Sequence, residues 1–256
     1  MQRIIAPEIN IDGSTVAVDE DLIADHLEKY FEANDNKRKA IVFSSPLGGI
    51  HVYCFAPSEE LKRNYWTLVT MGISGTKMNV PEDVDNPEGT RWNRCELMCY
   101  LPASWEFPTS LGNESDEKSW PVDMLRAVGM YVSQTGAWLG ESHGLPNMSS
   151  DPPGQVFCPQ TKLSHVILLD PSCIESPGFS PLELPDGSFV NFYLTVPLTS
   201  EEAAWKRAVG AADSIYYAVG SKEVGGDAIA IDYIIDPSRP CAVIDLNLPE
   251  RVGNGE

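Results

Sequence analysis

The chain has 256 residues, of which 43% are hydrophobic, so it is long and apolar enough to bury a substantial core. Its 37 acidic and 18 basic residues give a formal charge of −19, which repels phosphate backbones and anionic lipids and argues against nucleic acid or a membrane surface as a partner. No run of about 18 consecutive apolar residues occurs, and the first residues lack the basic-then-apolar order of a secretory signal. We therefore expect a cytoplasmic protein.

The first part of the chain predicts one helix followed by a pair of strands. A helix is expected to begin at Asp19, whose side chain can cap it, because apolar residues then recur at helical spacing over residues 22–31. Residues 50–56 and 65–73 are rich in β-branched and aromatic residues and are separated by a polar turn. They predict neighbouring strands.

Residues 94–101, RCELMCYL, predict a third strand. Alternation along a strand places one set of side chains on the same face, namely Cys95, Leu97, Cys99 and Leu101. Free cysteine is commonly buried, so Cys95 and Cys99 are predicted to fill the core. The spacing of all six cysteines matches no zinc-binding pattern; they are Cys54, Cys95, Cys99, Cys158, Cys173 and Cys241.

A second helix and a further strand are predicted in the middle of the chain. Pro121 suits the first turn of a helix, and apolar residues then follow at helical spacing up to Val132. Residues 136–155 contain so many Gly, Pro, Ser and Asn residues that we expect no regular structure there. Residues 163–170 predict a fourth strand.

The last part of the chain predicts a hairpin, a helix and a final β segment. The turn at residues 184–187, LPDG, is typical of hairpins and is followed by a strand that ends at Pro197. Thr199 and Glu202 form a capping box that opens a helix. Residues 227–235 predict a last β segment. Strands in groups with helices between the groups predict an α/β (α+β) fold with a mixed, largely antiparallel sheet and packed helices.

No common catalytic motif occurs, and we assign neither a catalytic residue, a metal ligand nor a cofactor. His143 stands out because it lies on the predicted irregular segment beside Glu141, Ser142 and Asn147. Adjacent residues can rarely adopt the geometry of a Ser, His and acid triad, so ordering of the loop or a contact with a partner is favoured over catalysis. The remaining histidines lie in predicted helices or strands and are assigned structural roles: His26, His51 and His165.

Aromatic residues near the irregular segments are candidates for interface anchors, because Trp and Tyr dominate the energetics of protein interfaces. A place in the core is favoured for most of them. The set comprises Trp92, Trp105, Trp120, Tyr131 and Trp138.

Five segments occur in the same order as in a known family. They are YWTLVTMGISGTKMNVP (65–81), CELMCYLP (95–102), SWPVDMLRAVGMYV (119–132), WLGESHGLPN (138–147) and LPDGSFVNFYLTVPLTSEEAAWKRAVGA (184–211). Together they resemble the suppressor of fused family. The likeness covers about residues 45–245 and is treated as one domain over residues 1–256.

The resemblance implies an α/β sandwich-like domain with no known enzymatic activity. Animal members carry a second, C-terminal domain and hold a short extended peptide of Gli-type zinc-finger transcription factors between the two domains by strand addition. Bacterial members with a single domain resemble this chain more in length, and the family as a whole is associated with polymorphic toxin loci, where such proteins are proposed immunity factors. The acidity of this chain would suit a basic toxin domain.

The sequence therefore predicts a non-enzymatic protein-interaction module, in the first place an immunity-type protein that binds and neutralises a toxin domain. A regulator or scaffold that binds an extended peptide is the alternative, followed by a hydrolase that uses the His143 loop with Asp151. By resemblance, Tyr131 matches a peptide-facing tyrosine, His143 matches the histidine that follows a peptide-facing aspartate, and Ser142 takes the place of that aspartate. The predicted partner-binding residues are Tyr131, Trp138, Glu141, Ser142 and His143.

Overall fold

The computed structural model describes residues 20–34, 41–43, 49–108, 117–209 and 231–243. Its helices are α1 (Glu20–Phe31), α2 (Trp120–Thr135) and α3 (Ser200–Val209), with short 3₁₀ turns η1 (Ile73–Gly75), η2 (Pro87–Gly89) and η3 (Pro171–Cys173). Its strands are β1 (Ile41–Phe43), β2 (His51–Phe55), β3 (Tyr65–Met71), β4 (Cys95–Pro102), β5 (Gly144–Pro146), β6 (Leu163–Leu169), β7 (Leu182–Glu183) and β8 (Phe189–Thr199).

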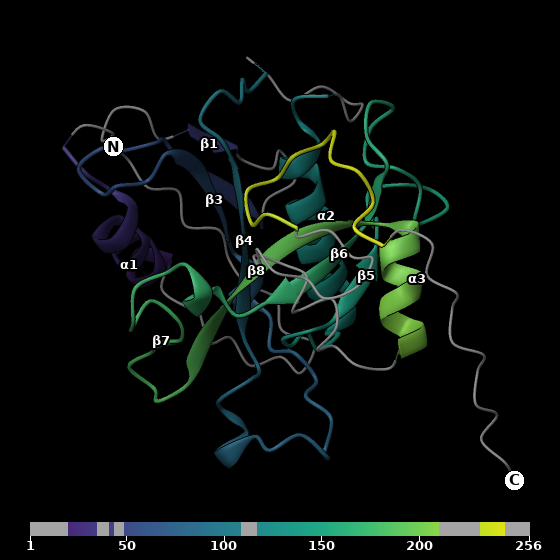
Figure 1. Ribbon diagram of the computed structural model, residues 1–256. Helices are drawn as coiled ribbons and strands as arrows, with labels where there is room; N and C mark the ends of the chain where they lie inside the picture. Colours follow the sequence, from purple (N-terminus) through teal and green to yellow (C-terminus); the bar gives the residue numbers. More distant parts are fainter. Residues whose placement is uncertain (1–19, 35–40, 44–48, 109–116, 210–230, 244–256) are drawn as a thin grey trace, which may run out of the picture.

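One sheet organises these elements (Figure 1). Its strand order is β1–β2–β3–β4–β8–β6–β5, and the short β7 pairs with β8 beside this path. The strands pair antiparallel except β4 and β8, which run parallel from Cys95 opposite Asn191 to Met98 opposite Leu194. The predicted α/β fold with a mixed, largely antiparallel sheet is therefore confirmed.

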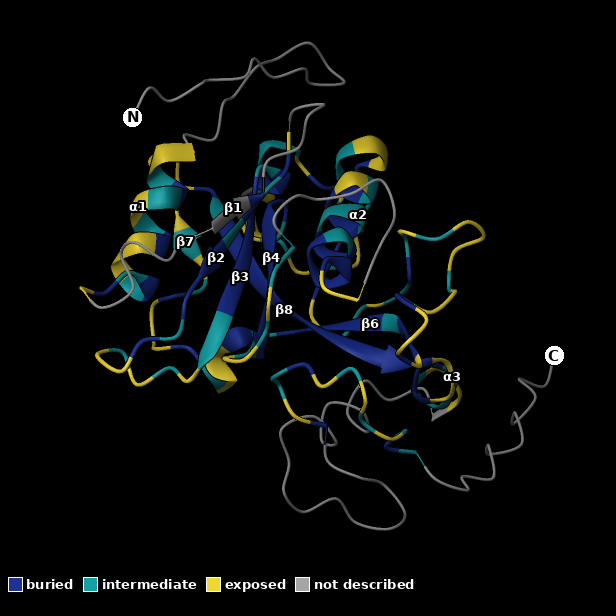
Figure 2. Cartoon of the chain, turned by 90° about the horizontal axis from the view of Figure 1, so that it is seen from above, coloured by how far each residue is buried: buried dark blue, intermediate teal, exposed yellow. Residues whose placement is uncertain are grey.

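The two faces of the sheet carry separate apolar layers. In β4 the alternation predicted from the sequence is observed, since Cys95, Leu97, Cys99 and Leu101 join the layer under α2. Met98 and Tyr100 join the opposite layer, which also contains the buried residues of α1. Figure 2 accordingly shows α1 and α2 on opposite sides of β2, β3 and β4, with buried residues concentrated between them.

A buried carboxylate fixes the end of β3. Glu96 is fully buried and accepts hydrogen bonds from the Thr70 hydroxyl, the Gly72 N–H and both the N–H and the hydroxyl of Ser74. Burial raises the pKa of Glu96, and these hydrogen bonds oppose the rise. The predicted strand thus ends at Met71, because the chain turns at Gly72 with φ 117°.

Gly72 also approaches another backbone segment closely. A β-carbon there would lie 1.8 Å from the carbonyl oxygen of Gly49, so no other residue fits without a shift of the backbone. The turn therefore requires glycine for both its dihedral angle and its space.

Two further sequence predictions, for the segment before β6 and for the end of β8, need correction. The segment 136–155, expected to be irregular, contains β5. The eighth strand does not end at Pro197 but continues to Thr199. Beyond Leu194, β4 no longer pairs with β8, so the missing N–H of the proline breaks no hydrogen bond to β4.

The last predicted β segment is wrong where the structure describes it. Between residues 231 and 235 the chain forms isolated bridges, one of them between Ile234 and Tyr100, and no strand. The rest of that segment, Asp19, and the helix beyond Val209 lie outside the described residues. Within the described ranges, no helix combines the length and the apolar character needed to cross a bilayer.

Candidate protein-binding site

The short strand β5 forms one end of the sheet. It pairs antiparallel with β6, placing Gly144 opposite Ile167 and Pro146 opposite His165. Just before it, the Ser142 N–H donates to the Leu168 carbonyl and the Leu168 N–H donates to the His143 carbonyl. Two residues of one strand thus oppose one of the other, which is a β-bulge, and Ser142 adopts a left-handed φ of 67° there.

The outer edge of β5 presents backbone groups to its surroundings. The antiparallel pattern directs the N–H and C=O of Leu145 to β6, so those of Gly144 and the carbonyl of Pro146 point away from the sheet. Gly144 is exposed, and Leu145 and Pro146 are half-buried. In the described part of the chain no strand pairs with this edge. It can therefore accept an added strand.

Trp138 and His143 come together beside β5. Their rings meet edge to face with centroids 4.7 Å apart. The Gly140 N–H donates to Nδ1 of His143 at 3.2 Å. Burial lowers the pKa of His143, the charge of Lys206 lowers it further, and a hydrogen bond with the Trp138 backbone opposes both effects. The lowered pKa favours the neutral imidazole, which is held by backbone groups of Trp138 and Gly140.

The other predicted residues make different contacts. Glu141 is exposed as a whole, but partial burial of its carboxyl group and the charge of Asp170 raise its pKa, and a hydrogen bond from the Asp170 backbone opposes this rise. Tyr131 is half-buried on α2, and its carbonyl accepts a hydrogen bond from Thr135 Oγ1 at 2.6 Å. No hydrogen bond or ring contact among the described residues joins Tyr131 to Trp138 or His143.

The components of a catalytic triad are not assembled at this loop. The ring of His143 bonds to backbone groups of Trp138 and Gly140, and no hydrogen bond within the described residues joins it to Ser142 or Glu141. Asp151 lies beyond β5 and makes no ion pair with His143 in that part of the chain. Nor does the described part contain three His, Cys, Asp or Glu residues placed to bind a metal ion.

Lys206 is a site residue that the sequence analysis missed. From α3 its ammonium group donates to the Ser142 carbonyl, at the start of β5. A β-carbon at Gly144 would lie 3.6 Å from Nζ of Lys206, at ordinary van der Waals contact, so the lysine lies on the side-chain face of Gly144. Burial lowers the pKa of Lys206, and the neighbouring Arg207 lowers it further. Helical spacing alone gave no signal that this residue reaches β5.

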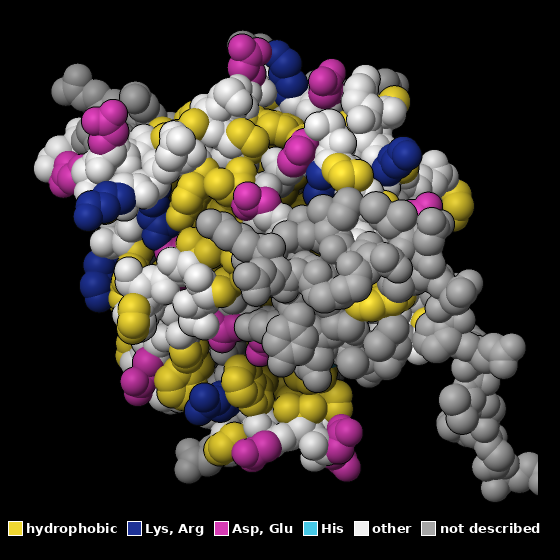
Figure 3. Space-filling model, in the orientation of Figure 1, with side chains coloured by type: hydrophobic (Ala, Val, Ile, Leu, Met, Phe, Trp, Pro, Cys, Tyr) yellow, Lys and Arg dark blue, Asp and Glu magenta, His cyan; other side chains and the backbone are white. Residues whose placement is uncertain are grey.

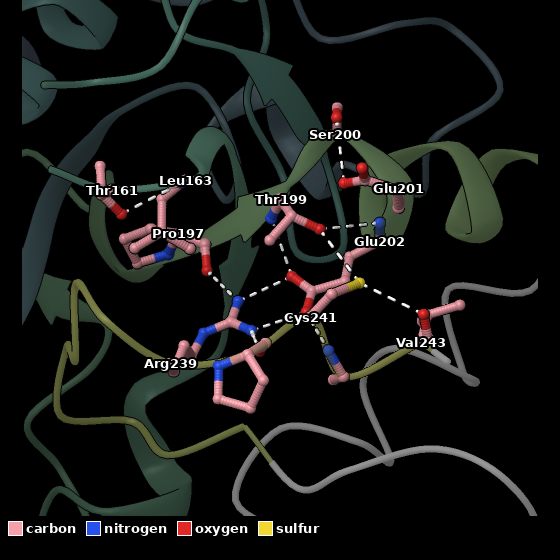
Figure 4. Close-up of polar contacts among 12 residues, drawn as sticks. Thr161, Leu163, Pro197, Thr199, Ser200, Glu201, Glu202, Arg239, Cys241 and Val243 are labelled. Atoms are coloured by element: carbon pink, nitrogen blue, oxygen red, sulfur yellow. Dashed lines mark hydrogen bonds and ion pairs between the residues drawn. The ribbon is translucent and has the colours of Figure 1, made fainter. Parts of the chain in front are cut away.

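A buried ion pair positions α3 and hence Lys206 (Figure 4). Glu202 lies one turn before Lys206, and its carboxylate binds both terminal nitrogens of Arg239 at 2.6 and 2.7 Å. It also accepts from the N–H groups of Thr199 at 2.8 Å and Ala242 at 2.6 Å. The bond to Thr199 and the return bond from the Glu202 N–H to Thr199 Oγ1 confirm the predicted capping box.

Arg239 ties a distant segment to this helix end. Its Nη2 also donates to the Pro197 carbonyl at 2.9 Å. Nearby, Thr161 Oγ1 donates to the Pro237 carbonyl at 2.7 Å. The segment 231–243, yellow in Figure 1, is thereby attached to the end of β8 and the start of α3.

The comparisons with known proteins agree with this fold. The model of the family described as suppressor of fused protein (SUFU) matches residues 44–217. The chain belongs to the suppressor of fused family. This membership places it among protein-interaction domains. No curated protein matches it in sequence.

Three solved structures are similar to the chain. A SUFU homolog from Neisseria gonorrhoeae FA 1090 has 15% identity and a TM-score of 0.53, over 89% of this chain and 98% of that chain. The Sufu–Fu complex has 18% identity and a TM-score of 0.48, over 83% of this chain and 88% of that chain. Drosophila Suppressor of Fused has 18% identity and a TM-score of 0.49, over 86% of this chain and 50% of that chain. At these identities the match to the Neisseria protein shows a shared fold.

Replacing Arg239 by methionine tests whether the ion pair anchors α3. The change leaves the fully buried Glu202 carboxylate without its cation, since 0% of that side chain is exposed. Loss of one partner of a buried pair costs about 3–5 kcal/mol. We expect a fall of that size in the free energy of unfolding, measured by urea denaturation.

The matched control is the exposed pair of Lys118 and Glu106, for which Lys118→Met should leave the denaturation curve unchanged. Adding Glu202→Gln to Arg239→Met should recover part of the loss, because no buried charge then remains. Strictly additive effects of the two changes would contradict this role.

Proposed function

We propose that the chain is a non-enzymatic protein-interaction module that binds an extended segment of a partner protein by strand addition to β5. The outer edge of β5, which no described strand covers, carries this proposal: Gly144 presents an N–H and a C=O outward, and Pro146 presents a C=O. Main-chain hydrogen bonds of this kind supply affinity, and neighbouring side chains supply specificity.

The two aromatic rings beside the edge, those of Trp138 and His143, also support strand addition to β5. Trp138 and His143 stand where the chain enters β5, and the bulge at Ser142 sets the direction of the strand. Trp138 is half-buried, and its indole N–H has no partner among the described residues. In this proposal Trp138, Ser142 and His143 border the bound segment, Glu141 lies at its exposed end, and Tyr131 contributes from α2 as a more distant contact.

A toxin domain is a second candidate for the partner, favoured by the net charge of −19. The acidic side chains on the face drawn in Figure 3 are scattered and do not form one patch. The net negative charge speeds the approach of any basic protein, so it supports a basic toxin without identifying a binding surface. In this version the chain is a cytoplasmic immunity protein that acts as one domain.

Two changes at the same residue test strand addition. Gly144→Pro removes the outward N–H, whereas Gly144→Ala keeps it and places the β-carbon at ordinary contact distance, 3.6 Å from Lys206 Nζ and 3.7 Å from the Val166 carbonyl. The probe is a set of linear peptides selected from a display library on the full chain. We expect Gly144→Pro to weaken their binding about tenfold, and Gly144→Ala to leave it nearly unchanged.

Affinities are measured by calorimetry, and melting temperatures confirm that both variants are folded. Equal binding by the proline and alanine variants would show that the edge of β5 is not the docking site.

Coexpression tests the toxin version. We expect a basic protein retained by the chain to arrest growth when produced alone and to become harmless when the chain is produced with it. Its retention should weaken at high salt, because salt screens the long-range attraction. Growth arrest that persists despite complex formation would contradict neutralisation while leaving strand addition intact.

A further inference from the structure

The outer edge of β5 has a positive charge on one side, from the ammonium group of Lys206. Lys206 lies over the position that a side chain of Gly144 would occupy, and its Nζ donates to the Ser142 carbonyl. No carboxylate among the described residues pairs with it. Glu141, three residues before Gly144, is repelled by the like charge of Asp170 and accepts a hydrogen bond from the Asp170 backbone.

A strand added to this edge would bury Lys206 further. The lysine is already half-buried, and both its burial and the nearby Arg207 disfavour its charge. The Ser142 carbonyl uses one of the three N–H donors of the ammonium group. Covering a charged group without a partner is unfavourable, so a bound segment that brings a carboxylate is preferred over one that does not.

The register of the edge identifies which residue must carry that carboxylate. Side chains directly opposite each other on neighbouring strands lie on the same face, with β-carbons about 4.5–5.5 Å apart. Lys206 occupies the face of Gly144, which has no side chain of its own. The residue of the added strand opposite Gly144 therefore points toward the ammonium group.

Building on the proposed function, we infer that the partner segment carries an Asp or Glu opposite Gly144, and that Lys206 selects it by forming an ion pair. The charge of the whole chain, −19, and this local positive charge then act at different stages. The electrostatic field of the whole chain affects the rate at which the partner approaches, and Lys206 selects the residue at one position of the bound segment.

A charge-swap experiment tests the inference with peptides from a random display library. Peptides are selected on the full chain, and those that do not bind the Gly144→Pro variant are kept. These peptides should share an acidic residue at one position. Replacing that residue by lysine should weaken binding about tenfold or more, and Lys206→Glu should restore the binding of the lysine peptide. The control is Arg207→Glu, which makes the same change of charge at an exposed neighbour on α3 and should not restore it.

Lys206→Met provides a second variant if the glutamate disturbs the fold, and it should abolish the preference for the acidic residue. The inference would be overturned if the peptides that lose binding to Gly144→Pro share no acidic residue. It would also be overturned if their preference for an acidic residue were unchanged by Lys206→Glu and Lys206→Met. Either result would leave strand addition intact. Absence of any peptide sensitive to Gly144→Pro would overturn both. A dimer of the chain that dissociates on Gly144→Pro, with no peptide bound, would assign the edge to a second copy.

Discussion

The carboxylate of Glu202 joins the end of β8 and the start of α3 to residues 239–242, which are distant in sequence. It binds the guanidinium of Arg239, the N–H of Thr199 at the end of β8 and the N–H of Ala242. Because this carboxylate is fully buried, it depends on all of these donors for its stability. The same bonds fix where α3 begins, and Lys206 reaches the bulge before β5 from the next turn of that helix. The charge at the sheet edge thus depends on an ion pair inside the protein.

Most of the fold could be predicted from local patterns because those patterns coincide with burial. Strand β4 alternates between the two apolar layers as its sequence indicates, with Cys99 on one face and Tyr100 on the other. The capping box at Thr199 was readable because both of its members lie within one helical turn. Burial also explains why Trp120, a possible interface anchor by composition, is a core residue with 1% of its surface exposed.

The candidate site was harder to predict because it depends on contacts between distant residues. Strand β5 consists of Gly, Leu and Pro, which have little strand propensity as a group, and it exists through its pairing with β6. The sequence predicted that Trp138 and His143 belong to one binding surface, but not that their rings are in contact. It also placed Tyr131 on the same surface, although no hydrogen bond or ring contact in the described part of the chain joins Tyr131 to either ring. The sequence around Lys206 does not indicate that this lysine contacts Ser142. Likewise, the sequence around Arg239 does not indicate its contact with Glu202.

The central functional claim is that the edge of β5 is open in the free chain and becomes paired when a partner segment binds. Hydrogen exchange followed by NMR tests it most directly at two neighbouring amides. The Gly144 N–H points outward and should exchange rapidly until a selected peptide is added, after which it should be protected. The Leu145 N–H points to β6 and should be protected throughout. A Gly144 amide that is protected without peptide, or that stays unprotected in the complex, would contradict strand addition at this edge.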